Sequence, residues 1–183
     1  SKSLSFIRSG AAKADALING LLRVSRLGFV PLNLERLDMN ELVREVLAEQ
    51  TPQVQIAGAE IHAGELPDCQ GDAGLIRQVL SNLFDNALNY RDPTRPLQVL
   101  FSGRVQGRQS IYCVADNGPG IGPEHQERIW EMFQRLNPDG QVAGEGLGLT
   151  LVRRILDRHH GRAWVESVPG EGSRFFVSLP ADG

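Results

Sequence analysis

The sequence predicts an α/β fold, a two-layer sandwich in which a mixed, mostly antiparallel sheet carries helices on one face. Helical and strand-like patterns are interspersed along the chain, and the last four strand candidates form two hairpins. Hydrophobic residues make up 41% of the 183 residues, which suits one globular domain with a short appendage. No apolar run approaches the roughly 20 residues that span a bilayer.

A long helical pattern, from about residue 3 to residue 27, precedes the sandwich. Its apolar residues recur at alternating spacings of three and four, as in the seam of a coiled coil. These residues are Leu4, Ile7, Ala11, Ala14, Ile18 and Leu21. We expect this helix to pack on a second copy or on an upstream helix, with packing on its own domain as the alternative. Pro31 ends the pattern, so we expect a separate helical part at 1–30 and the main domain at 31–183.

The first half of the main domain is expected to contain short strands and two capped helices. Asp38 and Asp72 are the predicted helix caps, and Glu41 stands in the capping-box position after Asp38. The expected elements are a strand at 32–37, a helix at 39–49, strands at 54–57 and 60–63 separated by Gly58, and a helix at 73–90.

The second half is expected to contain two hairpins and two helices. A tight turn at Gly107 and Arg108 joins the first pair of strands. Gly161 is the expected left-handed residue after the last helix, which ends at His159 and His160, where an imidazole suits the helix dipole. The expected elements are strands at 97–106 and 109–116, helices at 124–133 and 147–159, and strands at 162–168 and 174–179.

The helix at 73–90 has an unusual polar side, because Asn82, Asn86 and Asn89 lie at i, i+4 and i+7 on one stripe. Asparagine is a weak helix former, so three on one stripe indicate a role for their amide oxygens, with a merely solvated face as the alternative. Hard oxygen ligands of this kind suit Mg²⁺, which completes its shell with water and substrate phosphates.

Two glycine-rich segments follow. In "DNGPGIG", at 116–122, an apolar strand ends on Asp116, whose burial is costly unless something binds it. "GEGLGL", at 144–149, leads into a helix, where backbone N–H groups can hold a phosphate. It lacks the Gly-Lys-Ser/Thr of a Walker motif, and no strand precedes it as in a dinucleotide fingerprint. Each segment alone is a weak signal.

Taken in order, these motifs resemble the ATP-binding catalytic domain of sensor histidine kinases, which has the Bergerat fold of the superfamily that includes Hsp90, MutL and DNA gyrase B. "RQVLSNLFDNALNY" resembles the asparagine box, "DNGPGIG" the first glycine box, "IWEMFQRL" the phenylalanine box and "GEGLGLTLVRRI" the second glycine box. "HHGRAWVESVPGEGSRFFVSLP" is similar to the terminal hairpin, and "NYRDPTRP" is most similar to phytochrome-type kinases. The opening helix resembles the second helix of the dimerisation hairpin.

The resemblance implies that the chain binds ATP and Mg²⁺. Asp116 would accept a hydrogen bond from the adenine amine, while Gly118 and Gly120 let the backbone approach the base. Asn86 would ligate Mg²⁺ and act with Asn82 in catalysis. Further residues implied to contact the nucleotide are Asn89, Tyr90, Ile121, Phe133, Gly144, Gly146, Leu147, Gly148 and Leu149. The loop at 137–145 would be the lid.

The chain also departs from the family pattern. Asn89 stands where many relatives carry Lys, so phosphate affinity is expected to be weaker or to be supplied by Arg91 or Arg95. The phosphoacceptor, a His followed by an acidic residue and then a Pro, is missing. The four histidines without that context are His62, His125, His159 and His160.

We therefore expect phosphate transfer to a histidine upstream of this chain, relay to a response regulator receiver domain, and homodimerisation through the opening helix. Two alternatives remain: a degenerate ATP-binding or dimerisation module, and an ATPase that uses a Glu of the asparagine helix. Asn82 stands where that Glu is expected, and Asp85 lies off the stripe.

The net charge of −3 argues against a nucleic-acid partner. Cys69 and Cys113 form neither a disulfide framework nor a metal-ligand spacing. Few cysteines and no apparent secretory segment favour a cytoplasmic setting.

Overall fold

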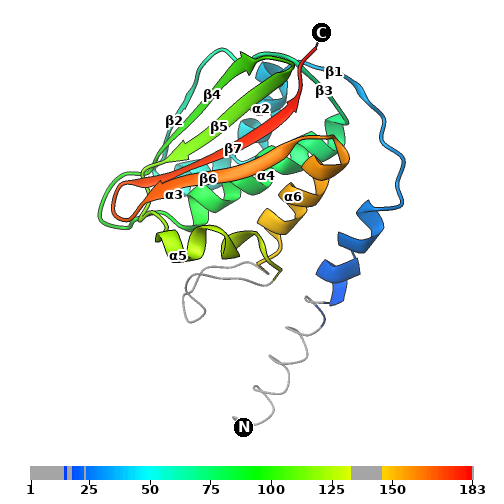
Figure 1. Ribbon diagram of the computed structural model, residues 1–183. Coiled ribbons are helices and arrows are strands. Elements are labelled where there is room, and N and C mark those ends of the chain that lie inside the picture. Colours follow the sequence, from blue (N-terminus) through cyan, green and yellow to red (C-terminus); the bar gives the residue numbers. More distant parts are fainter. Residues whose placement is uncertain (1–14, 16–17, 23, 133–145, 183) are drawn as a thin grey trace.

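The computed structural model describes residues 15, 18–22, 24–132 and 146–182, in which strands and helices form two layers (Figure 1). The larger sheet has the strand order β2-β4-β5-β7-β6. Its strands are β2 (Glu60–Ala63), β4 (Gln98–Gln106), β5 (Gln109–Asp116), β6 (Arg162–Val168) and β7 (Gly172–Pro180). β2 runs parallel to β4, and the other neighbouring pairs are antiparallel. The prediction of a mixed, mostly antiparallel sheet is confirmed.

Both predicted hairpins are present in this sheet. Gly107, with φ of 62°, turns the chain between β4 and β5, and Gly170, with φ of 86°, lies in the turn between β6 and β7. A left-handed backbone of this kind favours glycine, because a Cβ would be strained there. β5 and β7 lie side by side in the middle of the sheet, with Asp116 opposite Ser173.

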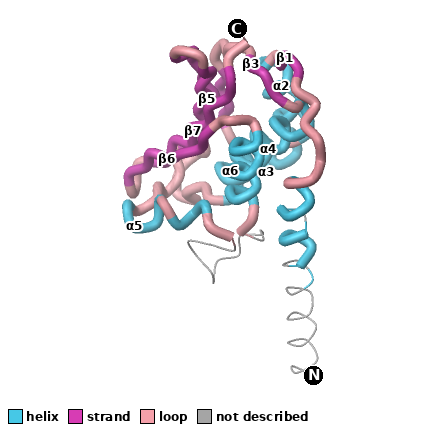
Figure 2. Tube along the Cα trace, turned by 45° about the vertical axis from the view of Figure 1, so that its right-hand side comes forward, coloured by secondary structure: helices cyan, strands magenta, loops and turns pink. Residues whose placement is uncertain are grey.

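Helices cover one face of the larger sheet, and Figure 2 shows its strands β5, β6 and β7 on one side with α4 (Ala73–Asn89) and α6 (Gly148–Arg158) on the other. Asp72 Oδ1 accepts a hydrogen bond from the Leu75 N–H at 3.1 Å, and Asp38 Oδ1 accepts one from the Glu41 N–H at 3.0 Å. Both predicted caps are thus confirmed. Further helical elements are α2 (Met39–Glu49), α3 (Thr51–Ala57), α5 (Pro123–Gln126) and the 3-10 helix η1 (Arg128–Trp130).

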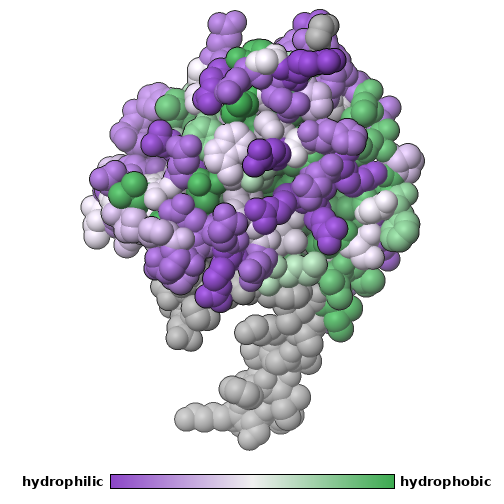
Figure 3. All heavy atoms as spheres, in the orientation of Figure 1, coloured by the Kyte–Doolittle hydropathy of each residue, from purple (hydrophilic) through white to green (hydrophobic). Residues whose placement is uncertain are grey.

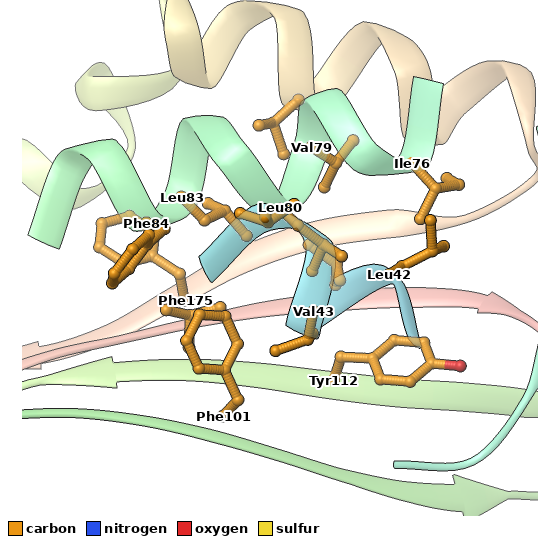
Figure 4. Close-up of a cluster of buried hydrophobic side chains, with 14 of the residues drawn as sticks. Leu42, Val43, Ile76, Val79, Leu80, Leu83, Phe84, Phe101, Tyr112 and Phe175 are labelled. Atoms are coloured by element: carbon orange, nitrogen blue, oxygen red, sulfur yellow. The ribbon is translucent and has the colours of Figure 1, made fainter. Parts of the chain in front are cut away.

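The hydrophobic core fills the space between the helices and the sheet. Figure 4 shows Val43 of α2 and Phe84 of α4 together with Phe101 and Phe175 of the sheet. The rings of Phe84 and Phe101 lie 5.7 Å apart, centroid to centroid. Burial of each such side chain contributes about 1.5–3 kcal/mol. This packing fixes one face of α4 against the sheet and so determines where its asparagine stripe lies.

The predicted strand at 54–57 is wrong, because these residues belong to α3. Val54 and Ala57 both pack against the core, which a helix allows and an alternating strand does not, and Ile56 is 83% exposed. Pro52 lies in the first turn of α3, and Gly58 ends the helix in a left-handed conformation with φ of 59°.

Two further predictions about elements need correction. The loop before Asp72 contains an unforeseen strand, β3 (Cys69–Gly71), which pairs antiparallel with β1 (Glu35–Leu37) in a separate two-stranded sheet. The helix expected at 124–133 is instead two short pieces, α5 and η1.

The carboxyl end of α6 also differs from the prediction. The left-handed residue after the helix is His160, with φ of 55°, and Gly161 is required for a different reason. A Cβ on Gly161 would lie 2.1 Å from the carbonyl oxygen of Ser178, so only glycine allows α6 to turn into β6 here.

His159 is buried and bridges two helices. Its Nε2 accepts a hydrogen bond from the Asp72 N–H at 3.0 Å, so the proton of the neutral ring is on Nδ1, which donates to the carbonyl oxygen of Ile155 at 2.7 Å. The predicted interaction of His159 with the end of α6 is therefore present as a neutral hydrogen bond, and the contact with α4 was not foreseen.

The described residues 18–22 and 24–27 are helical, as predicted. Ile18 and Leu21 of the predicted seam are exposed, whereas its other members lie outside the described residues. Figure 3 shows hydrophobic residues gathered over this helix and the segment that follows it. A groove of about 480 Å³ lies between this helix and the carboxyl-terminal half of α6. None of the described helices is long and apolar enough to cross a membrane.

The segment after this helix, residues 28–34, is called the linker below. Arg158 of α6 donates from Nη2 to the carbonyl oxygen of Val30. The N–H of Asn33 donates to Asp72 Oδ2 at 3.0 Å, so the cap of α4 is shared with the linker.

Candidate functional site

The asparagine stripe lies on α4, where it faces the start of α6. Asn82 Nδ2 donates to the carbonyl oxygen of Gly148 at 3.2 Å, which joins the stripe to the second glycine segment across 66 positions of sequence. Asn86 is half-buried, and its side chain makes no hydrogen bond within the described part of the chain. Asn89 is the last residue of α4 and is exposed. The structure therefore brings Asn82 into contact with the second glycine segment and leaves the amide of Asn86 available to bind a ligand.

Asp116 is the last residue of β5, and the glycine segment that follows it contacts the end of α4 at Tyr90. Its Oδ1 accepts a hydrogen bond from the Gly118 N–H at 2.8 Å. Burial raises the pKa of this carboxyl group, while hydrogen bonds from the N–H groups of Gly118 and Ser173 and the charge of Arg95 act in the opposite direction. A partly buried carboxylate held in this way can accept a hydrogen bond from a ligand.

The first glycine segment owes its glycines to the protein's own packing. A Cβ on Gly118 would lie 2.8 Å from Asp116 Oδ1 and 3.0 Å from the carbonyl oxygen of Tyr90. Gly120 has φ of 75°, and a Cβ there would lie 2.1 Å from the carbonyl oxygen of Val168. These contacts give a reason for the glycines that differs from the expected approach to a base, and they bring Tyr90 beside Gly118.

The second glycine segment leads into an uncapped helix. Gly146 has φ of 71°, and Leu147 stands at the cap of α6 with its side chain buried and no side-chain hydrogen bond to the first turn. The first N–H groups of α6 therefore have no partner within the helix and can bind an anion. Leu149 packs against the core. Phe133, Gly144 and the expected lid at 137–145 lie outside the described residues.

The two arginines expected to contact phosphate have other partners. Arg95 donates to the carbonyl oxygens of Gly118 and Gly170, and Arg91 Nη1 donates to that of Leu88 at 2.7 Å. Arg95 is committed to the backbone of the first glycine segment, so the structure does not bear out a phosphate role for it.

The structure also reveals supporting residues that were not predicted. Asn117 Oδ1 accepts from the Gln98 N–H at 2.8 Å, and its Nδ2 donates to the carbonyl oxygen of Pro96 at 3.0 Å. The N–H of Ile121, whose side chain is buried, donates to Ser167 Oγ at 2.8 Å. No sequence signal marks these contacts, because each joins segments that are distant along the chain.

Asp85, the carboxylate of α4 closest in sequence to the asparagines, faces away from the glycine segments. It lies beside Gln50, which comes between α2 and α3, and burial raises its pKa. The amide of Gln50 in turn donates to Ser81 Oγ at 3.1 Å. Asp85 is therefore held in the contact between α4 and its neighbouring helices.

The described residues fit a nucleotide with a magnesium ion. Among the described residues, the half-buried amide of Asn86 is a hard oxygen donor without a hydrogen-bond partner, the first N–H groups of α6 have no side-chain cap, and Asp116 offers a carboxylate beside the first glycine segment. Asn86 would hold the metal, Gly146 to Leu149 the phosphates, and Asp116 the base.

Such a sandwich, in which an asparagine helix contacts two glycine segments, is typical of a class of nucleotide-binding ATPase domain. A family model described as "Histidine kinase-, DNA gyrase B-, and HSP90-like ATPase" matches residues 71–183, and the chain belongs to this family. It includes the kinase class that the motifs resemble.

Individual relatives agree with this assignment. Cyanobacterial phytochrome B of Nostoc sp. (strain PCC 7120) is 37% identical over 181 residues, which cover 97% of this chain and 24% of that protein. Full-length ShkA in complex with AMPPNP superposes with a TM-score of 0.77 at 28% identity, covering 99% of this chain and 39% of the other. The nucleotide-free catalytic domain of histidine kinase ThkA gives a TM-score of 0.70 at 25% identity, covering 81% of this chain and 96% of that domain. The chain thus spans about a quarter of the curated relative.

Proposed function

We propose that this chain is the ATP-binding catalytic domain of a sensor histidine kinase. It binds ATP with Mg²⁺ and presents the γ-phosphate to a histidine outside this chain, from which the phosphate passes to the receiver domain of a response regulator. The helical part at 1–30 is proposed to contribute to a dimerisation hairpin, and the catalytic domain is proposed to span 31–183. A cytoplasmic location is proposed with this function.

One observation carries the proposal, the hydrogen bond between Asn82 Nδ2 and the Gly148 carbonyl oxygen. It joins the residues suited to metal with the helix terminus suited to phosphate. At the end of α4, the carbonyl oxygen of Tyr90 also lies beside Gly118, in the segment that contains Asp116. Base, phosphate and metal contacts then form one continuous site. The AMPPNP complex of ShkA, a protein of similar fold and 28% identity, supports a nucleotide as the ligand.

The residues of the chain have separate tasks in this proposal. Asp116, ionised, accepts a hydrogen bond from an exocyclic amine, which adenine has and the corresponding carbonyl of guanine lacks. The N–H groups at Gly148 and Leu149 hold phosphate oxygens, and Asn82 and Asn86 orient them from α4. Bound magnesium supplies neutralisation of phosphate charge, and catalysis of this kind depends mainly on positioning.

Calorimetry with ATP and GTP, on the parent and on Asp116→Asn, tests the adenine-reading role. We expect the parent to prefer ATP, and Asp116→Asn to lose about 1.5–3 kcal/mol of ATP binding, the contribution of one charge-assisted hydrogen bond. Asp157→Asn, which changes an exposed carboxylate on α6, serves as the matched control. Equal affinity of the parent for ATP and GTP would contradict this role of Asp116.

A further inference from the structure

Arg95 lies in the loop between α4 and β4 and joins two segments that are far apart in sequence. Its Nη2 donates to the carbonyl oxygen of Gly118 at 2.7 Å and to that of Gly170 at 2.8 Å. Gly118 belongs to the first glycine segment, and Gly170 lies in the turn between β6 and β7. One guanidinium nitrogen therefore bonds to both segments, which are also joined by the backbone hydrogen bond from the Gly170 N–H to the carbonyl oxygen of Pro119.

The loop itself orients the guanidinium. Asp92 Oδ1 accepts hydrogen bonds from the backbone N–H and the hydroxyl of Thr94, at 2.9 and 2.6 Å, which fixes the carboxylate. Asp92 Oδ2 then lies 3.5 Å from Arg95 Nε. Nε pairs with the charge of Asp92 without a hydrogen bond, and Nη2, on the same edge of the planar group, donates to the two carbonyl oxygens.

The same contacts reach Asp116 through the backbone of Gly118. The Gly118 N–H donates to Asp116 Oδ1 at 2.8 Å, while the carbonyl oxygen of Gly118 accepts from Arg95. Burial raises the pKa of Asp116, and three influences lower it: the N–H of Gly118, the N–H of Ser173 and the positive charge of Arg95. In the described part of the chain, Arg95 is the charged side chain that acts on Asp116, and Asp92 is its own ion-pair partner.

We propose that Arg95 is a positioning residue for base recognition, which holds the carboxylate of Asp116 in the orientation and charge state that adenine requires. This inference rests on the proposed function, in which Asp116 accepts a hydrogen bond from the base. Arg95 acts through Gly118 and through its charge, and it makes no contact with the nucleotide in this scheme.

Two substitutions separate the charge of Arg95 from its hydrogen bonds. Arg95→Met removes both, whereas Arg95→Lys keeps a positive charge without the planar group that Asp92 orients. Affinity for ATP is measured by calorimetry from about pH 8 down to about pH 5. This range lies above the ordinary aspartate pKa, where a raised pKa is expected. Arg104→Met, which removes an exposed arginine of β4, is the matched control, and the titration of ATP itself is common to all variants.

In the parent, affinity should fall as the pH drops through the pKa of Asp116, because the protonated carboxyl group no longer accepts a hydrogen bond with both oxygens. Arg95→Met should weaken ATP binding about tenfold at neutral pH and shift this loss to higher pH, since one influence that lowers the pKa is gone. Arg95→Lys should lose affinity while the pH of half-maximal loss stays that of the parent. Arg104→Met should match the parent in both respects.

The outcomes distinguish this inference from the proposed function. The inferred role of Arg95 is wrong if the parent binds ATP, Asp116→Asn binds it more weakly, and Arg95→Met behaves like Arg104→Met. In that case the proposed role of Asp116 still stands. If Asp116→Asn binds ATP as the parent does, the adenine-reading role itself is wrong. Thermal unfolding checks that each variant is folded. Should Arg95→Met not fold, Arg95→Lys decides: parent-like affinity overturns the inference, and reduced affinity with an unchanged pH profile supports it.

Discussion

Asp116 is held in the folded protein at a cost to stability. Because burial raises its pKa, the folded state binds the proton more tightly than the unfolded state does. The cost is therefore present in full at pH well above the raised pKa, where the group is ionised, and lessens as the pH falls through that pKa. A carboxylate kept in such a place is suited to accept a hydrogen bond from a ligand.

The amide of Asn86 differs from that of Asn82, because only Asn82 has a hydrogen-bond partner in the described structure. We predict that Asn86→Ala abolishes the Mg²⁺-dependent part of ATP affinity and leaves adenosine binding nearly unchanged, since adenosine has no phosphate to bring a metal. Calorimetry with ATP, with and without Mg²⁺, measures the Mg²⁺-dependent part of the affinity, and calorimetry with adenosine measures the rest. A variant that binds ATP with Mg²⁺ as the parent does would show that the metal is held by another residue.

At the scale of elements, the ends of α3 and α6 use the same left-handed conformation with different residues. Gly58 ends α3 with φ of 59°, whereas His160 follows α6 with φ of 55°. An L residue with a Cβ is strained in this region by roughly 1 kcal/mol relative to glycine. At the end of α6, His160 thus adopts a backbone conformation that is unfavourable for a residue with a Cβ.

We predict that His160→Gly raises the free energy of unfolding by up to about 1 kcal/mol. Gly58→Ala is the matched reverse change, because a Cβ on Gly58 meets nothing within 4 Å and the effect is purely conformational. It should lower the free energy of unfolding by about 1 kcal/mol. Urea denaturation of both variants measures the two changes, and a stability loss in His160→Gly would mean that the imidazole makes contributions beyond its backbone conformation.

How far the sequence predicts each element depends on how local its cause is. The start of α4 was predicted because its cap, Asp72, acts within one turn. β3 was missed because its three residues are held by pairing with β1, over 30 positions away. The candidate site follows the same rule: the spacing of the asparagines is visible in sequence, but the bond from Asn82 to Gly148 and the contacts of Arg95 depend on the folded chain.

At the scale of the whole molecule, the four histidines are all outside the proposed site. His62 lies 3.0 Å from Glu60 in β2, and His125 lies 3.4 Å from Glu124 in α5. His159 is buried between α4 and α6, and His160 follows α6. None combines an exposed ring with the sequence context of a phosphoacceptor.

We therefore predict that this chain alone remains unlabelled after incubation with γ-labelled ATP. A protein in which this chain follows a helix with a phosphoacceptor histidine should acquire label that is labile in acid and stable in base, as phosphohistidine is. Gel autoradiography after acid or base treatment measures this. Stable label on the chain alone, mapped to His159 or His160, contradicts the prediction, and an unlabelled longer protein favours the degenerate module.

The linker contacts α4 and α6 at the ends remote from the residues proposed to bind nucleotide. α4 has 17 residues and α6 has 11, so they extend about 25 and 16 Å at 1.5 Å per residue. Asn33 holds the start of α4 and Val30 the end of α6, while Asn86 and Gly148 lie toward the opposite ends. The linker is therefore hydrogen-bonded to both helices of the proposed site. If a displacement of the linker changes the affinity of the proposed site for nucleotide by some free energy, nucleotide binding biases the position of the linker by that same free energy.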